Sequence, residues 1–310
     1  MPRLTEAAEG VYVIAVTPFH PDGALDLDST DRMVDFYLSV GATGLTVLGM
    51  MGEAQKLTIE ESQIVVRRIL SRVDGRVPVV VGVSAPGFAQ MASLTQMVME
   101  DGAAGVMIAP PSAVRTDDQV VSYYAQAASF IGDVPFVLQD FPLVTNVQMS
   151  VPVIRRIVNE LPGCVCLKHE DWPGLDKITA LRAPGALDRR ISILCGNGGM
   201  FLPEEMGRGA DGAMTGFAYP EMMTDVVRLA RAGEAERARD VFDAYLPLAR
   251  YEQQPGIGLA VRKYTMARRG IIANGALRRP GMALGAQTIA EIEHLIQRQE
   301  RRLKDLNEWI

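Results

Sequence analysis

Cysteine and aromatic residues are scarce in this sequence: 3 of its 310 residues are cysteine, and 6% are Phe, Trp or Tyr. Two of the cysteines, Cys164 and Cys166, lie one residue apart on an expected strand, so they do not suggest a disulfide framework and instead indicate a reducing compartment. A Cys-x-Cys pair without a second cysteine or a histidine cluster is also a poor zinc site. We therefore predict no metal site and expect the cysteines to fill the core.

Basic blocks and long apolar runs are missing as well. The net charge is −6, and no cluster of lysine and arginine points to a nucleic acid partner. No apolar run approaches the ~18 residues that span a membrane, and residues 1–6 lack the pattern of a signal peptide. With 48% hydrophobic and 22% charged residues the composition is globular. We expect a cytoplasmic protein with no membrane partner.

Two stretches resemble the dinucleotide-binding glycine motif and the hydrolase nucleophile elbow, but each lacks a glycine that its motif requires. In Gly196-Asn197-Gly198-Gly199, the third glycine of a dinucleotide loop would fall on Phe201. In the stretch 82–86, Pro86 replaces the closing glycine of a nucleophile elbow. The sequence has no Walker lysine loop and no His-Glu-x-x-His. The chemistry has to come from another arrangement of residues.

Eight short apolar runs alternate with helical patterns, and this alternation predicts the fold. The runs are rich in Val, Ile and Leu, as expected for parallel strands buried on both faces. Capping boxes at Thr58 and Thr116 begin two helices, and Ser150 begins a third. The pattern indicates an α/β fold, the (β/α)8 TIM barrel. A doubly wound sheet is the alternative. The predicted strands are 11–17, 44–48, 77–83, 104–108, 135–139, 164–168, 191–195 and 212–215.

The strand pattern stops after about residue 222, which divides the chain into two parts. We predict that residues 1–222 form the (β/α)8 barrel and carry the active site, because barrel enzymes place their chemistry in the loops after the strands. Residues 223–310 have only helical patterns. We expect them to form a C-terminal helical appendage packed on the barrel, since no low-complexity linker separates it.

The stretch 164–171 ends a buried apolar run in a lysine. Because side chains alternate along a strand, we expect Cys164 and Cys166 on the same face as Lys168, opposite Val165. The lysine amine then lies where the strand emerges, beside small residues that leave room for a nucleophile. A solvated strand end is the alternative interpretation of this lysine.

Other strand ends carry glycines and ionisable residues. The glycines at 49 and 52 let backbone N–H groups turn toward a carboxylate or phosphate, although an ordinary tight turn is the alternative. His169, Glu170 and Asp171 are consecutive, so their side chains diverge along a strand. This spacing favours a structural or electrostatic role over a metal site.

Together these features resemble a known family over essentially the whole chain. A lysine that ends strand six, a Gly-x-x-Gly-Glu loop at 49–53, the opening 16–19 with Asp22-Gly23, and a helical tail are similar to the dihydrodipicolinate synthase / N-acetylneuraminate lyase family. The resemblance implies a class I lyase in which Lys168 forms a Schiff base with a small-molecule 2-keto acid. It implies no cofactor besides this covalent imine, and a homotetramer built from dimers.

The sequence departs from the best-known family members in its proton donors. Typical synthases and sialate lyases carry a tyrosine after strand five, where this chain has Gln139, and a threonine or serine pair where it has Met50-Met51. The second tyrosine of the synthases falls near Ser112. Glutamine cannot exchange a proton as a tyrosine hydroxyl does. These departures argue against lysine biosynthesis and sialate cleavage.

The resemblance and the strand ends together define the predicted site. Lys168 and Gln139 are the predicted catalytic residues. The general base stays open among a water held by Gln139 and Ser112, the substrate's own carboxylate, and Glu170. The predicted substrate-binding residues are Gly49, Met50, Met51, Gly52, Ser112, Gly196, Asn197, Thr215 and Gly216.

A narrower likeness suggests the reaction. The patterns Gln139-Asp140-x-Pro142, 212–216, Glu252-x-x-x-Gly256 and 278–280 are similar to L-2-keto-3-deoxyarabonate dehydratase. The likeness predicts dehydration of a 2-keto-3-deoxy sugar acid such as 2-keto-3-deoxyarabonate. A retro-aldolase that releases pyruvate from a 2-keto-3-deoxy or 4-hydroxy-2-keto acid is one alternative. A non-catalytic keto-acid sensor is another.

Overall fold

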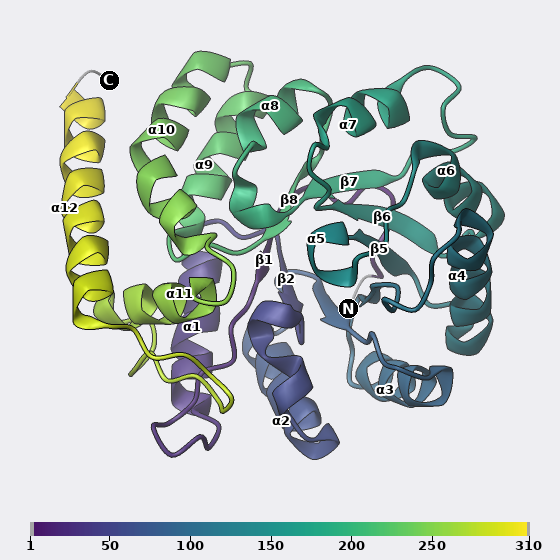
Figure 1. Cartoon of the computed structure of the whole chain (residues 1–310), viewed down its shortest axis with the longest axis horizontal. Helices are drawn as coiled ribbons and strands as arrows, with labels where there is room; N and C mark the ends of the chain where they lie inside the picture. Colours follow the sequence, from purple (N-terminus) through teal and green to yellow (C-terminus); the bar gives the residue numbers. More distant parts are fainter. Residues whose placement is uncertain (1–2, 309–310) are drawn as a thin grey trace.

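Eight parallel strands close into a barrel in the computed structural model, which describes residues 3–308. Each strand pairs with the next along the chain, and β1 pairs with β8 to close the sheet (Figure 1). The predicted (β/α)8 barrel is therefore confirmed. The strands are β1 Gly10–Ile14, β2 Gly44–Val47, β3 Val79–Gly82, β4 Gly105–Ile108, β5 Phe136–Asp140, β6 Cys164–His169, β7 Ser192–Cys195 and β8 Gly212–Thr215.

Helices follow the strands, and three of them begin at the predicted caps Thr58, Thr116 and Ser150. Thr58 Oγ1 accepts a hydrogen bond from Glu61 N, and Glu61 accepts one from Thr58 N, which confirms that capping box. The helices are α1 Leu27–Ser39, α2 Ile59–Val73, α3 Phe88–Glu100, α4 Asp117–Ile131, α5 Pro142–Thr145, α6 Val151–Glu160, α7 Leu175–Arg182, α8 Leu202–Gly207, α9 Pro220–Arg231, α10 Ala235–Glu252, α11 Gly258–Arg268 and α12 Ala286–Glu308. Short 3₁₀ turns are η1 Met50–Gly52, η2 Ala54–Lys56 and η3 Asn197–Gly199.

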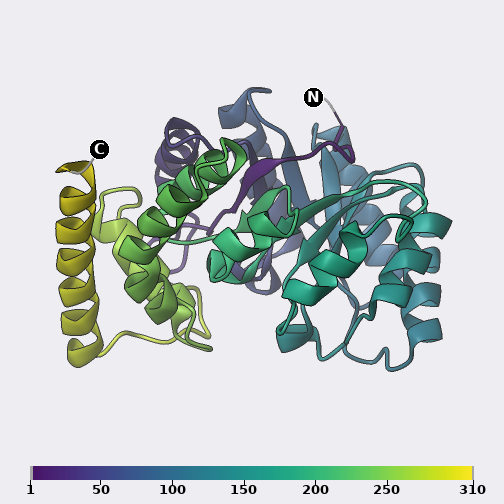
Figure 2. The same ribbon diagram turned by 90° about the horizontal axis from the view of Figure 1, so that it is seen from above.

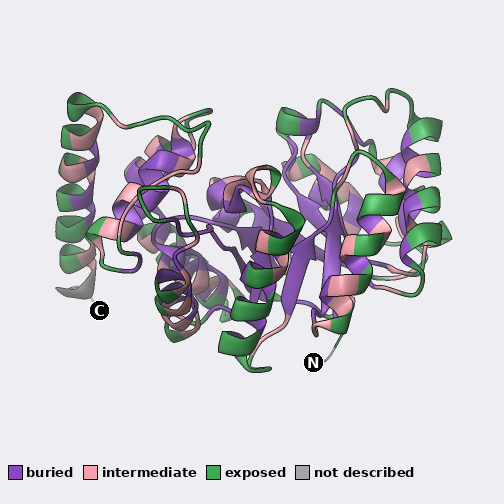
Figure 3. Ribbon diagram, turned by 90° about the horizontal axis from the view of Figure 1, so that it is seen from below, coloured by how far each residue is buried: buried purple, intermediate pink, exposed green. Residues whose placement is uncertain are grey.

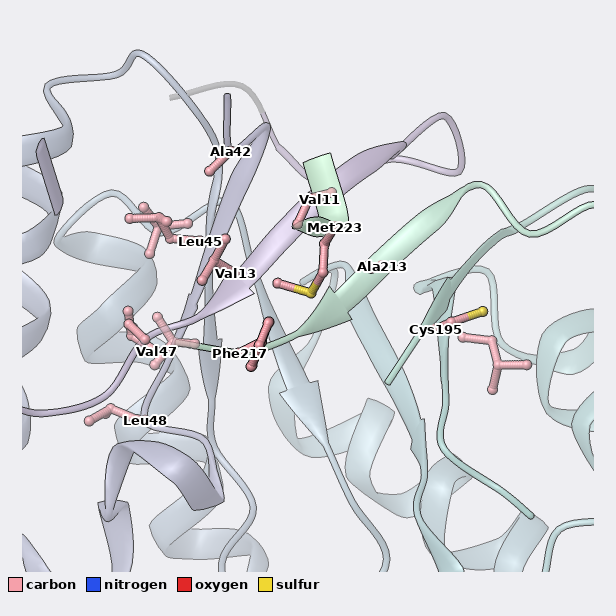
Figure 4. Packing of buried hydrophobic residues seen from close by; sticks show 14 of the residues in the cluster. Val11, Val13, Ala42, Leu45, Val47, Leu48, Cys195, Ala213, Phe217 and Met223 are labelled. Carbon is pink, nitrogen blue, oxygen red and sulfur yellow. The ribbon is translucent and has the colours of Figure 1, made fainter. Parts of the chain in front are cut away.

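The core has two layers separated by the sheet. Inside the barrel, one cluster gathers side chains such as Tyr12, Met107 and Met214. A larger cluster lies between the strands and the helices, where Figure 4 shows Met223 of α9 beside Val13 and Ala213. The strands are buried while the outer helix faces are exposed (Figure 3). Burial on both faces explains why the strands lack polar alternation.

A bulge in β6 corrects one sequence expectation. Phe136 pairs with Cys164, but Val137 pairs with Cys166, so β6 holds one extra residue at Val165. A bulge shifts the alternation of side chains by one. Cys164 therefore packs in the outer cluster and Val165 inside the barrel, and the predicted shared face of Cys164, Cys166 and Lys168 is wrong at Cys164.

The C-terminal helices gather on one side of the barrel, with α12 at its outer edge (Figures 1 and 2). Residue 222, the predicted end of the barrel part, falls inside α9, which packs on β1 and β8 and completes the eighth unit. The all-helical part therefore begins after α9, and the division into two domains stays a prediction. Among residues 3–308, no helix combines the length and hydropathy needed to cross a bilayer.

Candidate active site

Lys168 and Glu170 face each other at the end of β6. Lys168 Nζ lies 3.1 Å from Glu170 Oε2, and both side chains are only 6% exposed. Cys166, two residues before Lys168, belongs to the cluster inside the barrel. Because residues two apart on a strand share a face, Lys168 also points toward the barrel interior. A lysine and a carboxylate are thus paired in a site that excludes most water.

Residues that follow or end the two strands beside β6 hold Glu170 in place. Gln139, at the end of β5, donates from Nε2 to Glu170 Oε2 at 2.8 Å. Asn197, after β7, donates from Nδ2 to the Glu170 carbonyl at 2.8 Å. A Cβ atom at Gly196 would overlap Glu170 Cγ, so the side chain occupies space that only glycine leaves. Gly196 and Asn197 both lie against Glu170, and their predicted role in substrate binding stays a prediction.

The two predicted residues at the end of β8, Thr215 and Gly216, make contacts of their own. Thr215 Oγ1 accepts a hydrogen bond from Gly198 N at 2.8 Å, which ties the β7 and β8 loops together. Gly216 lies against Arg262, whose Nη2 donates to the Gly216 carbonyl. Arg262 in turn pairs with Glu252 at 2.6 Å, and both are buried. Through these contacts α10 and α11 brace the rim of the barrel.

The loop after β2 is bracketed by two residues in left-handed backbone conformation. Leu48 has φ +54° and Glu53 has φ +55°, with η1 between them. Glycine at 82 permits this path, because a Cβ there would overlap the Leu48 carbonyl. The first turn of any helix leaves N–H groups without an intrahelical partner. Met50 and Met51 occupy that first turn, so their N–H groups are suited to an anion.

A cavity of about 580 Å³ reaches this site at Gln139, and within residues 3–308 Lys168 and Glu170 are not among its lining residues. Gln139 and Met107 lie at its barrel end, and Gly49 and Met50 line one side. Ser112, predicted near the substrate, is exposed in the loop between β4 and α4, and within residues 3–308 it is not among the lining residues. A volume of this size is ordinary for a small-molecule site.

The sequence profile described as the Dihydrodipicolinate synthetase family matches residues 7–299. The chain belongs to the dihydrodipicolinate synthetase family. Its members are lyases, so the chain is an enzyme of that class, as the resemblance implied.

Relatives within the dihydrodipicolinate synthetase family have different names. The L-2-keto-3-deoxyarabonate dehydratase of Azospirillum brasilense is 30% identical over 95% of this chain and 95% of its own length. A 4-hydroxy-tetrahydrodipicolinate synthase of Sorangium cellulosum is 30% identical over 94% and 96%. A crystal structure titled dihydrodipicolinate synthase from Rhodopseudomonas palustris matches with a TM-score of 0.94 and 53% identity, over 96% of this chain and 100% of that one. These relatives share the fold and the family, and their names describe different reactions.

On the outer side of β6, next to Lys168, lies a second set of ionisable groups. Asp140 points to the helix side, as expected from alternation, and Lys177 Nζ lies 2.7 Å from both Asp140 and Asp171. His169 Nε2 lies 3.1 Å from the carbonyl of Gly174. These contacts agree with a structural role for His169 and Asp171. Glu170 alone of the three consecutive residues faces Lys168.

Glu205 adds a buried carboxyl to this outer layer. It lies in α8 beside the Cys195 thiol and is 6% exposed. Desolvation raises the pKa of Glu205 to about 7, although the nearby His169 acts to lower it. The folded chain therefore holds a proton on Glu205 over a pH range in which the unfolded chain has lost it. By linkage, this group makes stability fall as pH rises from about 4.5 to about 7.

We expect Glu205→Gln to remove that fall. Each pKa unit corresponds to about 1.4 kcal/mol, so the variant should be more stable than the wild type at pH 8 by up to about 3 kcal/mol, and no more stable at pH 4. Urea unfolding at both pH values measures this difference. Glu204→Gln, on the exposed side of the same helix, is the matched control. If the free energy of unfolding of Glu205→Gln depends on pH as strongly as that of the wild type, Glu205 does not carry the proton.

Proposed function

We propose that this lyase forms a Schiff base between Lys168 and a 2-keto acid, and then eliminates water across C3 and C4 of a 2-keto-3-deoxy acid. The observation that carries the proposal is the Glu170 carboxylate 3.1 Å from Lys168 Nζ, buried where Gln139 stands in place of a tyrosine. The likeness to an L-2-keto-3-deoxyarabonate dehydratase supports the same reaction type. L-2-keto-3-deoxyarabonate is therefore the first substrate to test.

The lysine supplies the electron sink. Neutral Lys168 Nζ attacks C2 of the keto acid, and loss of the C2 oxygen as water gives a protonated imine. The imine draws electrons from C3, so a C3 proton can leave to a base and an enamine forms. The enamine then expels the 4-hydroxyl, which leaves as water once it has gained a proton. Hydrolysis of the remaining imine frees Lys168 and the product.

Glu170 is the proposed acid and base for these proton transfers. Its carboxylate can take the proton that Lys168 must lose before it attacks, and it is close enough to reach the C3 proton of a substrate bound to Nζ. The same proton can then go to the departing 4-hydroxyl. Gln139 has no exchangeable proton of suitable acidity, so its role is to hold Glu170 by the 2.8 Å hydrogen bond.

The substrate carboxylate is proposed to bind at the loop after β2. The N–H groups of Met50 and Met51 at the start of η1 provide two donors without bringing a charge. Gly52 holds the loop from below, because its carbonyl accepts a hydrogen bond from Thr17 Oγ1 at 2.6 Å. The methionine side chains replace the hydroxyls of the typical family pattern and leave the backbone donors intact.

Product identification tests the proposed reaction. Incubation with 2-keto-3-deoxypentonates and 2-keto-3-deoxyhexonates should give a product lighter by one water and no pyruvate. Pyruvate as the main product would replace dehydration with retro-aldol cleavage of C3–C4, which uses the same lysine. A chain that binds these acids without turnover would be a sensor instead.

The proposed assembly and location follow from the family likeness alone. We propose a homotetramer with a small-molecule 2-keto acid as its ligand, in the cytoplasm. Light scattering of the purified full chain should give four times the mass of 33.7 kDa. A monomer or dimer at assay concentration would contradict the tetramer and would leave the chemistry of Lys168 unaffected.

A further inference from the structure

Glu53 anchors the loop that is proposed to receive the substrate carboxylate. It follows Gly52 directly, joins η1 to η2, and is 4% exposed with φ +55°. A non-glycine residue in this conformation costs free energy that the surroundings must supply. The carboxylate of Glu53 receives three hydrogen bonds, from Lys263 Nζ at 2.6 Å, Lys56 Nζ at 2.8 Å and Arg278 N at 3.1 Å.

Lys263 reaches this carboxylate from the C-terminal helices. It belongs to α11, lies 210 positions away along the chain from Glu53, and its side chain is 0% exposed. Its Nζ also donates to the Ala276 carbonyl at 3.0 Å and lies 4.5 Å from the centre of the Phe19 ring. A buried charge of this kind is costly unless it is paired, so its position is set by Glu53.

We propose that Lys263 is a positioning residue, which holds Glu53 and thereby keeps the Met50 and Met51 N–H groups aimed at the substrate carboxylate. The inference rests on the proposed function, because it assigns Lys263 to carboxylate binding at that site. It gives the C-terminal helical part a role in substrate binding through the Lys263–Glu53 contact, which is separate from the Lys168–Glu170 pair.

The contacts predict a specific defect when Lys263 is lost. Without it, Glu53 keeps Lys56 and the Arg278 N–H group but loses its most buried partner, so the loop between the left-handed residues 48 and 53 can relax. Binding of a carboxylate should weaken. The covalent step should be spared, because Lys168 and Glu170 are held by β5, β6 and β7.

Borohydride trapping with pyruvate measures both steps without knowledge of the natural substrate. For Lys263→Met in the full chain, the pyruvate concentration that gives half-maximal labelling of Lys168 should rise about tenfold, which corresponds to about 1.4 kcal/mol. Labelling at saturation should stay complete. If the single variant fails to fold, the Glu53→Gln, Lys263→Met double variant removes both charges and should show at least the same rise, because it loses the Lys263–Glu53 contact and also weakens the contacts of residue 53 with Lys56 and Arg278.

Arg182→Met is the matched control for lost stability. Arg182 lies at the opposite end of the barrel, where its side chain donates to the carbonyls of Gly209 at 2.8 Å and Ile191 at 2.9 Å. This variant should lose stability and keep the wild-type half-maximal concentration. An unchanged half-maximal concentration in folded Lys263→Met would overturn this inference alone. Absence of any adduct in the wild type would overturn the proposed function, and this inference with it.

The pH dependence separates positioning from stability. Desolvation lowers the pKa of Lys263 to about 8; Glu53 opposes this change, and Lys56 and Arg278 add to it. Between pH 8 and about 10.5 the folded chain binds fewer protons here than the unfolded chain, so this group's contribution to stability rises with pH. Over the same range its ion pair with Glu53 is lost, so the half-maximal pyruvate concentration should rise relative to Lys263→Arg, which stays charged. Parallel profiles for the two proteins would overturn the inference.

Discussion

Lys168→Ala should lose turnover by more than about 10⁴-fold, because no other group can form the imine that stabilises the C3 carbanion. The expected loss is the same for dehydration and for retro-aldol cleavage, since both need the electron sink at C2. Steady-state assay of the substrate identified above, with product quantified by mass, measures the effect. The Lys168 side chain is buried against Glu170, so far-ultraviolet circular dichroism should accompany the assay to show that the barrel still forms.

The size of any turnover that remains in Lys168→Ala shows whether the lysine acts covalently. Exogenous amines such as methylamine can enter a truncated lysine site and restore part of the reaction. A folded Lys168→Ala protein that keeps more than a tenth of wild-type turnover without added amine would mean that the lysine only pairs with Glu170 and does no covalent chemistry.

Glu170→Gln should lower kcat by about 10²–10⁴-fold, the usual worth of a positioned general acid–base. The amide keeps an oxygen that can accept the hydrogen bond from Gln139, so the geometry from β5 to β6 should persist. What the variant lacks is a group that can accept and return a proton. Its pyruvate adduct should still form, more slowly, because the lysine is unchanged.

Two comparisons make the result specific to Glu170. Gln139→Leu removes only the orienting hydrogen bond and should lower kcat less than Glu170→Gln does. Gly196→Ala should resemble Glu170→Gln, since the added Cβ would overlap the Glu170 side chain and displace it. If the turnover of Glu170→Gln stays within threefold of the wild type, Glu170 is not the general base. A bound water or the substrate's own carboxylate would then take that role.

The fold could be predicted from the sequence because its signals are local. Apolar runs with turn residues at both ends mark all eight strands, and the capping boxes at Thr58 and Thr116 mark helix starts. The extra residue at Val165 was missed, since a bulge depends on the register with β5 and leaves no local mark. The boundary at 222 fell inside α9 because that helix belongs to the barrel by its packing on β1 and β8.

The site could be predicted only in part, because several of its contacts join residues that lie far apart in the sequence. Lys168 is marked by its strand, and Glu170 could have been chosen with it, because residues two apart share one face. The roles of Gly196 and Asn197 depend on how close β7 comes to Glu170, which the sequence does not record. The pairing of Glu53 with Lys263 joins residues 210 positions apart, and nothing in the sequence near either residue indicates the other.

The central claim is that Lys168 carries the substrate as an imine. The wild-type chain should be incubated with pyruvate and sodium borohydride, digested, and the labelled peptide sequenced by mass spectrometry. We predict one reduced pyruvate adduct per chain, on Lys168, and none on Lys168→Ala. No adduct, or an adduct on another lysine such as Lys177 or Lys263, would contradict the account.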